Sequence, residues 1–222
     1  MRSVPIITVD GPSGSGKGTL SSALGGSLGW TILDSGALYR AIAFDAGRKK
    51  IDFHEELKIF GLVKSLNIEL KSSKVFLNGE DVSENIRTEE VGLRASKIAS
   101  NPKLRRSILD FQRSFISLPG LVADGRDMGT VVFPEAQLKI FLTASASVRG
   151  ERRFIQLKNK GLSVSLPDLI KQIRERDSQD ENRQVAPLRA AQEAVILDSS
   201  ENTIEEVLDL AMLEVRKRGL AA

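Results

Sequence analysis

The chain of 222 residues contains no cysteine and only one histidine, one tryptophan and one tyrosine. The lack of cysteine excludes disulfides, thiolate metal ligands and a cysteine nucleophile. The single histidine, His54, lies in an Asp-Phe-His-Glu-Glu run at the expected start of a helix, so we expect it on the surface and outside the catalytic machinery. The scarcity of aromatic side chains argues against a groove in which nucleic-acid bases stack.

Long apolar runs and a strong charge imbalance are also missing. The apolar segment at residues 4–9 is interrupted by Pro5 and followed by Asp10, so we expect neither a signal peptide nor a membrane span. The 32 basic and 29 acidic residues give a net charge of +3, which does not favour general polyanion binding. We therefore expect a cytoplasmic monomer that folds as one unit over residues 1–222 and binds neither nucleic acid nor membrane.

The most informative segment is a glycine-rich stretch between a β-branched run and a helix-forming sequence. Its glycines let the backbone turn tightly, so that successive N–H groups converge on phosphate oxygens at a helix N-terminus. Lys17 is placed to reach the β- and γ-phosphates of a nucleoside triphosphate. The expected binding residues are Gly11, Pro12, Ser13, Gly14, Ser15, Gly16, Lys17, Gly18 and Thr19.

The residue after this lysine departs from the usual pattern. Gly18 stands where serine or threonine is common, and the hydroxyl comes one place later, at Thr19. Direct ligation of Mg²⁺ by a side-chain hydroxyl is therefore in doubt, and phosphate oxygens and water are the expected ligands. We predict no metal-binding side chain.

Strand-like and helix-like segments alternate along the chain, which predicts an α/β protein. We expect a P-loop three-layer core with a parallel sheet, and its strands at residues 4–9, 32–34, 121–124, 138–142 and 195–198.

One segment breaks the alternation. Residues 67–82 show period-two alternation around an Asn-Gly pair, which predicts a small antiparallel sheet of about three short strands. Helices are expected at residues 89–99 and 104–117. We infer an inserted subdomain at about residues 36–118, within a core made of residues 1–35, 119–148 and 185–222.

Two arginines follow expected strand ends, where open α/β sheets bind their ligands. Arg40 comes after Asp34-Ser35-Gly36, and Arg126 lies in Asp124-Gly-Arg-Asp127. The alternative for Arg40 is a solvated helix residue, and for Arg126 a structural ion pair.

Arginine also outnumbers lysine in two later helical segments, which favours bidentate recognition of phosphate. Arg149, Arg152 and Arg153 share one helix face. The second helix begins near Pro167 and carries Arg174, Arg176, Asp177, Asp180 and Arg183. Residues 161–165 between them have the character of the tip of a lid, which we place at about residues 149–184.

With these motifs the chain resembles the bacterial cytidylate kinases of the long form, within the nucleoside monophosphate kinase family. The resemblance extends from Ile7 to Val215, and its most specific segments are residues 10–19, 33–40, 124–134 and 174–188. It implies transfer of the γ-phosphoryl group of ATP, with Mg²⁺, to CMP or dCMP in pyrimidine nucleotide metabolism, giving CDP or dCDP. The inserted segment would be the monophosphate-binding subdomain.

The resemblance also implies roles for individual residues. Ser35, Arg40 and Arg126 would hold the acceptor phosphate, with Arg183 nearby, and Asp180 would reach the ribose. Cytosine would be read by Ser96, Arg105 and Asp127; an arginine can donate to O2 and N3, and a carboxylate can accept from the N4 amino group. Arg152 would help to bind ATP, and the residues acting on the transferred group would be Lys17, Arg126, Arg153 and Arg176.

Two other functions remain compatible with the motifs. A kinase of another small acceptor, such as uridylate, adenylate or shikimate, would share the loop and the core. A P-loop switch or nucleic-acid-associated NTPase would suit the sequence pI of about 9.2. Acceptor assays separate the first from a cytidylate kinase, and stimulation of hydrolysis by RNA would favour the second.

Overall fold

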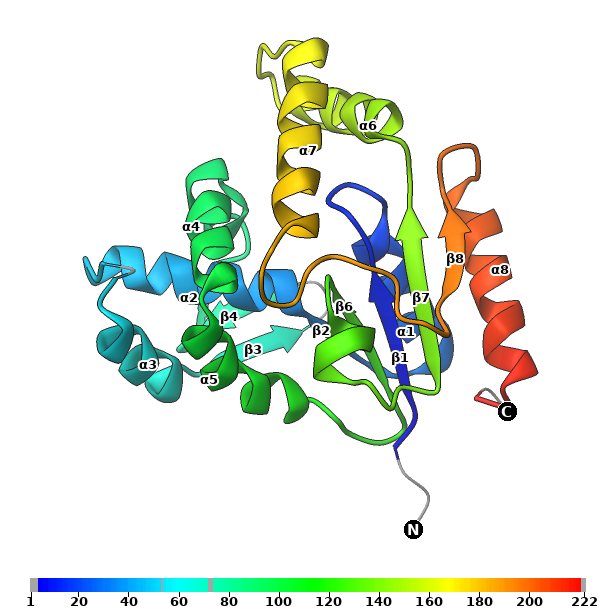
Figure 1. Cartoon of the computed structure of the whole chain (residues 1–222), viewed down its shortest axis with the longest axis horizontal. Coiled ribbons are helices and arrows are strands. Elements are labelled where there is room, and N and C mark those ends of the chain that lie inside the picture. Colours follow the sequence, from blue (N-terminus) through cyan, green and yellow to red (C-terminus); the bar gives the residue numbers. More distant parts are fainter. Residues whose placement is uncertain (1–3, 53, 72–73, 221–222) are drawn as a thin grey trace.

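A five-stranded parallel sheet forms the centre of the protein (Figure 1). The computed structural model describes residues 4–52, 54–71 and 74–220. The sheet has the order β2-β6-β1-β7-β8. Its strands are β1 (Ile6–Asp10), β2 (Thr31–Asp34), β6 (Leu121–Gly125), β7 (Leu138–Thr143) and β8 (Val195–Asp198). The predicted α/β class with a parallel sheet is therefore confirmed.

The first strand begins two residues later than its sequence suggests. Pro5 has no N–H to donate to a neighbouring strand, and only its carbonyl takes part, accepting from the Leu121 amide at 3.0 Å. The regular ladder between β1 and β6 starts at Ile6 and runs to Asp10.

The sheet is covered on both faces, as its fully buried central strands require. Ile7 and Val9 pack with helices α1 (Lys17–Leu28) and α8 (Ile204–Lys217). Ile6 points to the opposite face and packs with the π-helical turn η2 (Met128–Val132). Alternation along β1 thus supplies two separate apolar clusters, one for each face.

The chain between β2 and β6 forms an arm with a hydrophobic core of its own, which lies within residues 37–108. The prediction of a three-stranded antiparallel sheet is confirmed, with the order β3-β4-β5. We call residues 35–113 the inserted arm. Its elements are α2 (Ser35–Arg48), α3 (Glu56–Ser65), β3 (Ile68–Lys71), β4 (Lys74–Leu77), β5 (Glu80–Asp81), η1 (Asn85–Arg87), α4 (Glu89–Ser100) and α5 (Pro102–Arg113).

The boundaries of α5 differ from the predicted 104–117. Asn101 caps the helix by accepting from the amides of Lys103 and Leu104, so the helix starts at Pro102. It ends at Arg113. Phe115, outside the helix, still packs edge-on against Phe111, with ring centroids 5.5 Å apart.

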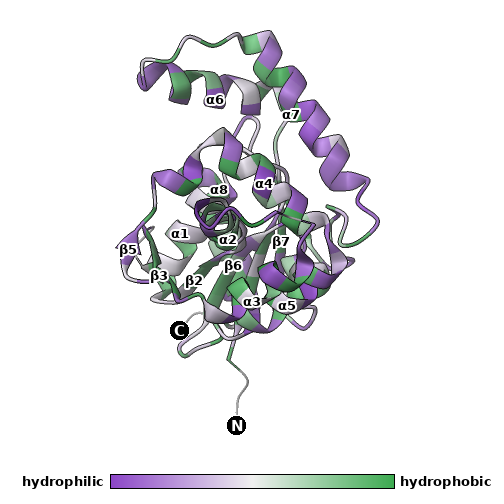
Figure 2. Ribbon diagram, turned by 90° about the vertical axis from the view of Figure 1, so that its left-hand side faces the viewer, coloured by the Kyte–Doolittle hydropathy of each residue, from purple (hydrophilic) through white to green (hydrophobic). Residues whose placement is uncertain are grey.

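Two helices, α6 (Ala146–Asn159) and α7 (Leu166–Glu181), project from the body of the molecule (Figures 1 and 2). Residues 160–165 join them and include residues 161–165, the expected tip of a lid. Hydrophilic residues alternate with hydrophobic ones along both helices (Figure 2). Beyond α6, Lys160 reaches across to Glu84 of the inserted arm, with 3.6 Å between Nζ and Oε2. None of the helices in the described residues is long and apolar enough to span a bilayer.

Candidate active site

The glycine-rich loop connects β1 to α1 with a positive φ at Gly11, Gly14 and Gly16. Gly11 has φ of +150°, and a Cβ there would lie 2.0 Å from the carbonyl oxygen of Leu142. Gly16 has φ of +93° and is the N-cap of α1. A side chain at either position would strain or displace the loop.

The N-terminus of α1 also lacks the side-chain cap found on most helices of this protein. In α5, α7 and α8, for example, Asn101, Ser165 and Thr203 accept from amides of the first turn. Gly16 has no side chain to do so. The first N–H groups of α1 are therefore available to an anion.

Lys17 is buried at this helix end, beside a buried carboxylate. Its ammonium donates to the Pro12 carbonyl at 2.8 Å. Burial, together with the nearby Arg126, lowers the pKa of Lys17 to about 7. Burial likewise raises the pKa of Asp124, at the end of β6, to about 7. A Cβ at Gly18 would lie 3.4 Å from Oδ2 of Asp124, so the residue after the lysine faces this carboxylate.

A second buried carboxylate, Asp10, fixes the turn that carries the expected base-reading residue. Its two oxygens accept from the amides of Met128 and Gly129, each at 2.8 Å. Burial raises the pKa of Asp10 to about 6, although these two hydrogen bonds lower it. Asp127 immediately precedes this anchored turn.

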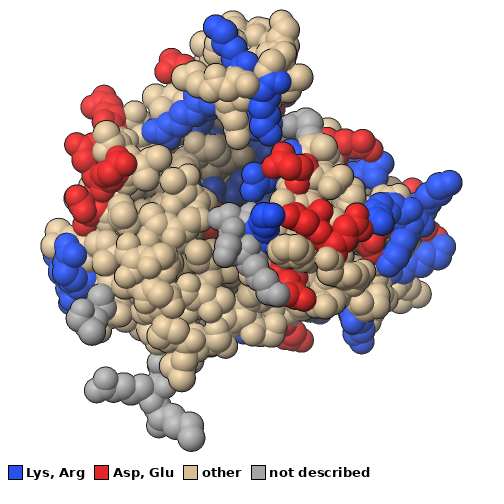
Figure 3. All heavy atoms as spheres, turned by 180° about the vertical axis from the view of Figure 1, so that it is seen from behind, with Lys and Arg blue, Asp and Glu red and all other residues tan. Residues whose placement is uncertain are grey.

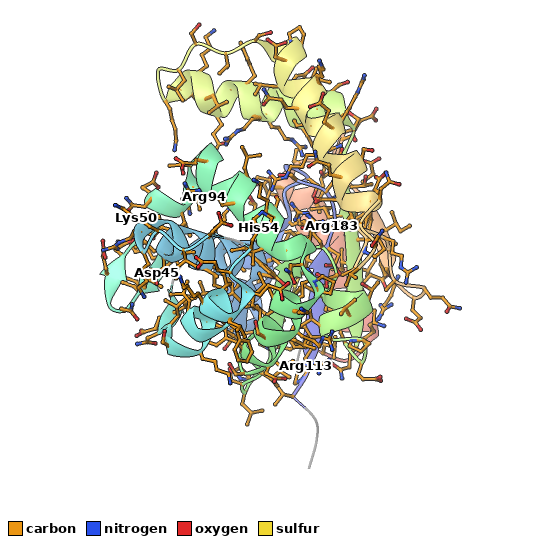
Figure 4. The ribbon with its side chains drawn as sticks, turned by 60° about the vertical axis from the view of Figure 1, so that its left-hand side comes forward. Asp45, Lys50, His54, Arg94, Arg113 and Arg183 are labelled. Atoms are coloured by element: carbon orange, nitrogen blue, oxygen red, sulfur yellow. The ribbon has the colours of Figure 1, made fainter. Side chains whose placement is uncertain are left out.

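Three of the residues expected to bind the acceptor phosphate and ribose lie together. Arg126 donates from Nε to Oδ2 of the buried Asp180 at 3.1 Å. Arg183 donates to the other carboxylate oxygen of Asp180. Arg183 lies near the lower end of α7, beside the body of the protein (Figure 4). The alternative reading of Arg126 as half of an ion pair is thus correct in part, but its partner comes from α7 and not from its neighbours in sequence.

The other two expected phosphate ligands lie on α2, within the inserted arm. Ser35 is buried and accepts from Nε2 of Gln112 at 2.8 Å. Arg40 donates from Nη1 to the carbonyls of Ile86 at 2.9 Å and Thr88 at 3.2 Å. Arg40 is therefore held against the arm, not extended into solvent.

The two residues expected to read the base by charge form a buried ion pair. Arg105 of α5 donates to Asp127, which is only 3 % exposed, and also to the carbonyl of Ala99 at 3.1 Å. Burial raises the pKa of Asp127, and Arg105 opposes that shift. The guanidinium lies 5.8 Å from the ring centroid of Tyr39, within the range of a cation–π contact. Ser96 lies half-buried on α4, one turn before Ala99.

Tyr39 was not singled out from the sequence. Its hydroxyl is buried without a hydrogen-bond partner among the described residues, and burial raises its pKa to about 12. Gln112 and Asp124 were also missed as site residues. The strand-end position of Asp124 was a usable signal, whereas Gln112 looks like any polar residue of an amphipathic helix.

The lid arginines occupy different environments. Arg152 donates to Oγ of Ser199 at 3.1 Å, and that hydroxyl in turn donates to the Ser15 carbonyl at 2.9 Å. Arg153 donates to Gln156 of the same helix at 2.8 Å, and Arg176 lies on α7. Arg152 is thereby linked to the glycine-rich loop through Ser199. A pocket of about 440 Å³ lies at this point, lined by residues that include Ser15, Gly16, Thr19, Arg152, Ser199 and Thr203.

Positive charge is concentrated around the space that these groups share. Figure 3 shows Lys and Arg side chains on the lid and in the hollow beneath it. No group of three or more His, Asp or Glu side chains suited to a metal ion occurs in the described part of the chain. The concentration of Lys and Arg side chains favours a highly charged anion as the ligand.

Comparison with known proteins agrees with this chemistry. Residues 7–217 match the cytidylate kinase family. A cytidylate kinase of Stutzerimonas stutzeri is 51 % identical over 227 residues, covering 100 % of this chain and 99 % of the relative. One of Aeromonas salmonicida is 52 % identical over 208 residues, covering 92 % of this chain and 90 % of the relative.

Among solved structures, an uncharacterised protein of Eubacterium ventriosum has a similar fold. Its TM-score is 0.50 at 10 % identity, covering 96 % of this chain and 99 % of that one. This likeness concerns the fold alone. The family match and the full-length relatives show that the chain belongs to the cytidylate kinase family.

Proposed function

We propose that the chain transfers the γ-phosphoryl group of ATP to CMP or dCMP, giving CDP or dCDP. The family supports the reaction. The observation that favours a cytosine acceptor is the buried Arg105–Asp127 pair. It offers donors for O2 and N3 and an acceptor for the N4 amino group.

The donor would bind with its phosphates over the glycine-rich loop. The uncapped N–H groups of α1 and the ammonium of Lys17 suit a triphosphate. The 440 Å³ pocket beside Thr19 and Arg152 would take the nucleoside part of ATP. Binding near Arg152 is favoured because its guanidinium already lies at the rim of that pocket.

The acceptor would lie between the inserted arm and α7. Ser35, Arg40 and Arg126 would bind its phosphate, with Arg183 nearby. Asp180 would accept from a ribose hydroxyl, and the base would meet Ser96 together with the Arg105–Asp127 pair. The inserted arm and the lid would then act as subdomains, at about residues 36–118 and 149–184, on a core made of the remaining residues.

The reaction needs no protein base, because the acceptor phosphate already presents an anionic oxygen at neutral pH. The protein must align two polyanions and neutralise charge on the transferred group. Arg126 lies close enough to Lys17 to help lower the pKa of its ammonium. Arg153 and Arg176 would join them from the lid, which would also exclude water from the γ-phosphate.

The residues fit a magnesium ion bound mainly by the substrate. Mg²⁺ keeps several waters and commonly takes one or two carboxylates with phosphate oxygens. Asp124, buried beside Lys17 and facing Gly18, is the carboxylate in the right environment. The ion would supply charge neutralisation on the phosphates. We further propose that the enzyme is cytoplasmic and acts as a monomer, because one chain carries all the residues proposed to bind the two substrates.

The proposal is tested by release of ADP in a coupled assay with ATP and each of CMP, dCMP, UMP and AMP. Turnover that depends on CMP or dCMP supports it. Turnover with AMP or UMP alone would assign the chain to another acceptor. A rate of ATP hydrolysis that is unchanged by all four nucleotides but increased by RNA would contradict a kinase function.

A further inference from the structure

Arg149 of the lid differs from Arg152 and Arg153 because it is buried against the backbone of the glycine-rich loop. Arg149, in the first turn of α6, is only 5 % exposed. Its Nε donates to the Ala144 carbonyl at 2.8 Å, and its Nη1 donates to the Ser13 carbonyl of the glycine-rich loop at 3.2 Å. The loop backbone also lies along the side chain, because a Cβ on Gly14 would be 3.4 Å from Cβ of Arg149.

The same guanidinium makes a bidentate ion pair with the second lid helix. Nη1 and Nη2 donate to the two carboxylate oxygens of Asp177 on α7, at 2.9 and 2.6 Å. The side chain of Asp177 is 15 % exposed, so water screens this pair only weakly. A planar fork of this kind fixes orientation as well as distance, which a lysine ammonium cannot do.

The position of this pair gives it influence over the residues proposed to act on the phosphoryl group. Arg153 follows Arg149 by one helical turn on α6, and Arg176 precedes Asp177 on α7. A change in the Arg149–Asp177 pair that shifts α6 or α7 would therefore move Arg153 or Arg176 relative to the loop. Because the same guanidinium also donates to the Ser13 carbonyl, a movement of the loop backbone would displace the guanidinium and alter its pairing with Asp177.

We propose that Asp177 is a positioning residue which, through Arg149, couples the glycine-rich loop to the lid. Occupation of the loop by the phosphates of ATP then favours the lid orientation that presents Arg153 and Arg176. The inference rests on the proposed function, since it concerns how the donor site prepares that transfer. It predicts a loss of communication between loop and lid when the carboxylate is removed.

The test uses Asp177→Asn, which keeps the shape of the side chain but replaces one accepting oxygen by a donor that faces the guanidinium. Glu175→Gln is the matched control, because it makes the same change of charge at an exposed position of the same helix. Hydrogen exchange is followed with and without ATP, in the absence of CMP. We expect ATP to protect both residues 11–16 and residues 149–184 in the parent and in Glu175→Gln, but only residues 11–16 in Asp177→Asn.

Kinetics provide the second readout. We expect Asp177→Asn to lower kcat by about 100-fold, as misplacement of a positioned group can, with little change in the KM for CMP. Lid protection and kcat at parental values in Asp177→Asn would overturn the proposal. If that variant does not fold, Arg149→Lys replaces it, and full kcat with retained lid protection in Arg149→Lys would overturn the bidentate coupling.

The two proposals fail in different ways. If the chain does not use CMP, the parent shows no CMP-dependent turnover, yet ATP still protects the lid and Asp177→Asn still abolishes that protection. If the coupling is wrong, the parent turns over CMP but the exchange pattern of Asp177→Asn matches that of Glu175→Gln.

Discussion

The proposed donor and acceptor sides of the candidate active site are built in opposite ways. The proposed donor side is one continuous segment, residues 11–19, in which the loop after the central strand β1 leads into the first turn of α1. The acceptor side is assembled from side chains that are far apart in sequence, such as Ser35, Arg105 and Asp180. The first kind of site follows from local backbone geometry, whereas the second exists only once the fold has formed.

The two sides also differ in how their charge is held before a substrate binds. On the donor side, Lys17 donates to a loop carbonyl, and N–H groups of α1 have no side-chain cap. On the proposed acceptor side, Arg126 and Arg183 already share the carboxylate of Asp180, whereas Arg40 donates to two backbone carbonyls. We infer that the phosphates of ATP bind N–H groups that have no side-chain cap. The phosphate of CMP must instead compete with the carboxylate that holds Arg126 and Arg183 in place.

The largest effect is expected on the donor side, from Lys17→Ala. The ammonium acts on charge that develops in the transition state, and loss of one such group costs about 10²–10³-fold in kcat. Thermal unfolding should show a folded protein, since the change also removes a buried charge. Near-normal turnover of a folded variant would exclude the proposed donor site.

On the acceptor side, Arg40→Ala and Arg126→Ala should weaken CMP use and leave ATP affinity nearly unchanged. A hydrogen bond to a charged group contributes about 1.5–3 kcal/mol, so kcat/KM for CMP should fall by roughly 10- to 150-fold. Arg94→Ala is the control, because Arg94 of α4 pairs with the exposed Glu90. Loss of ATP binding with intact CMP binding would place these arginines on the wrong side of the site.

Within the acceptor side, Asp127→Asn separates recognition of the base from recognition of the phosphate. An amide can donate to O4 of uracil, so UMP should become a better substrate relative to CMP. The ratio of kcat/KM for CMP to that for UMP should fall by a factor equivalent to roughly 1–3 kcal/mol. The ratio is the proper quantity, because removing one partner of a buried ion pair also destabilises the fold by about 3–5 kcal/mol. Equal losses with CMP and UMP would show that Asp127 does not read the base.

The smallest effect concerns protons taken up when ATP binds without metal. The pKa of Lys17 is lowered to about 7 in the free protein, and nearby phosphates raise it, so the lysine gains a proton on binding above pH 7. The pKa of Asp124, already raised to about 7, rises further for the same reason. We expect uptake at pH 8 and an affinity that falls as pH rises above about 7.

Calorimetry at pH 8 in two buffers of different ionisation enthalpy measures this uptake. Lys17→Met, which retains length but not charge, should take up fewer protons than the parent. Binding without any proton uptake in the parent would contradict the buried, mutually perturbed state of Lys17 and Asp124.

The contrast between the two sides explains which parts of the fold and of the candidate site could be predicted from the sequence alone. The loop, the parallel sheet and the small antiparallel sheet follow from local patterns such as Gly-Lys and Asn-Gly. The acceptor residues Ser96 and Arg105 were indicated only by resemblance to a family, because on their helices they look like surface residues. Their burial depends on the packing of the inserted arm, which no local pattern encodes.

Other differences have similarly specific causes. Helix α5 ends at Arg113 and not at residue 117 as predicted. The prediction was too long because Phe115 continues the apolar spacing of the helix, although it packs on Phe111 from outside the helix. The partner of Arg126 could not be found in its own motif, since Asp180 arrives from the lid helix α7. Pairings between distant segments are the part of the site that the sequence does not display.

The claim that the acceptor side reads cytosine is tested most directly by competition. The parent enzyme is given ATP with equal concentrations of CMP and UMP, and the initial amounts of CDP and UDP are compared. A polar contact of at least about 1 kcal/mol predicts an excess of CDP of roughly fivefold or more. Equal formation of CDP and UDP would contradict base recognition by the buried Arg105–Asp127 pair.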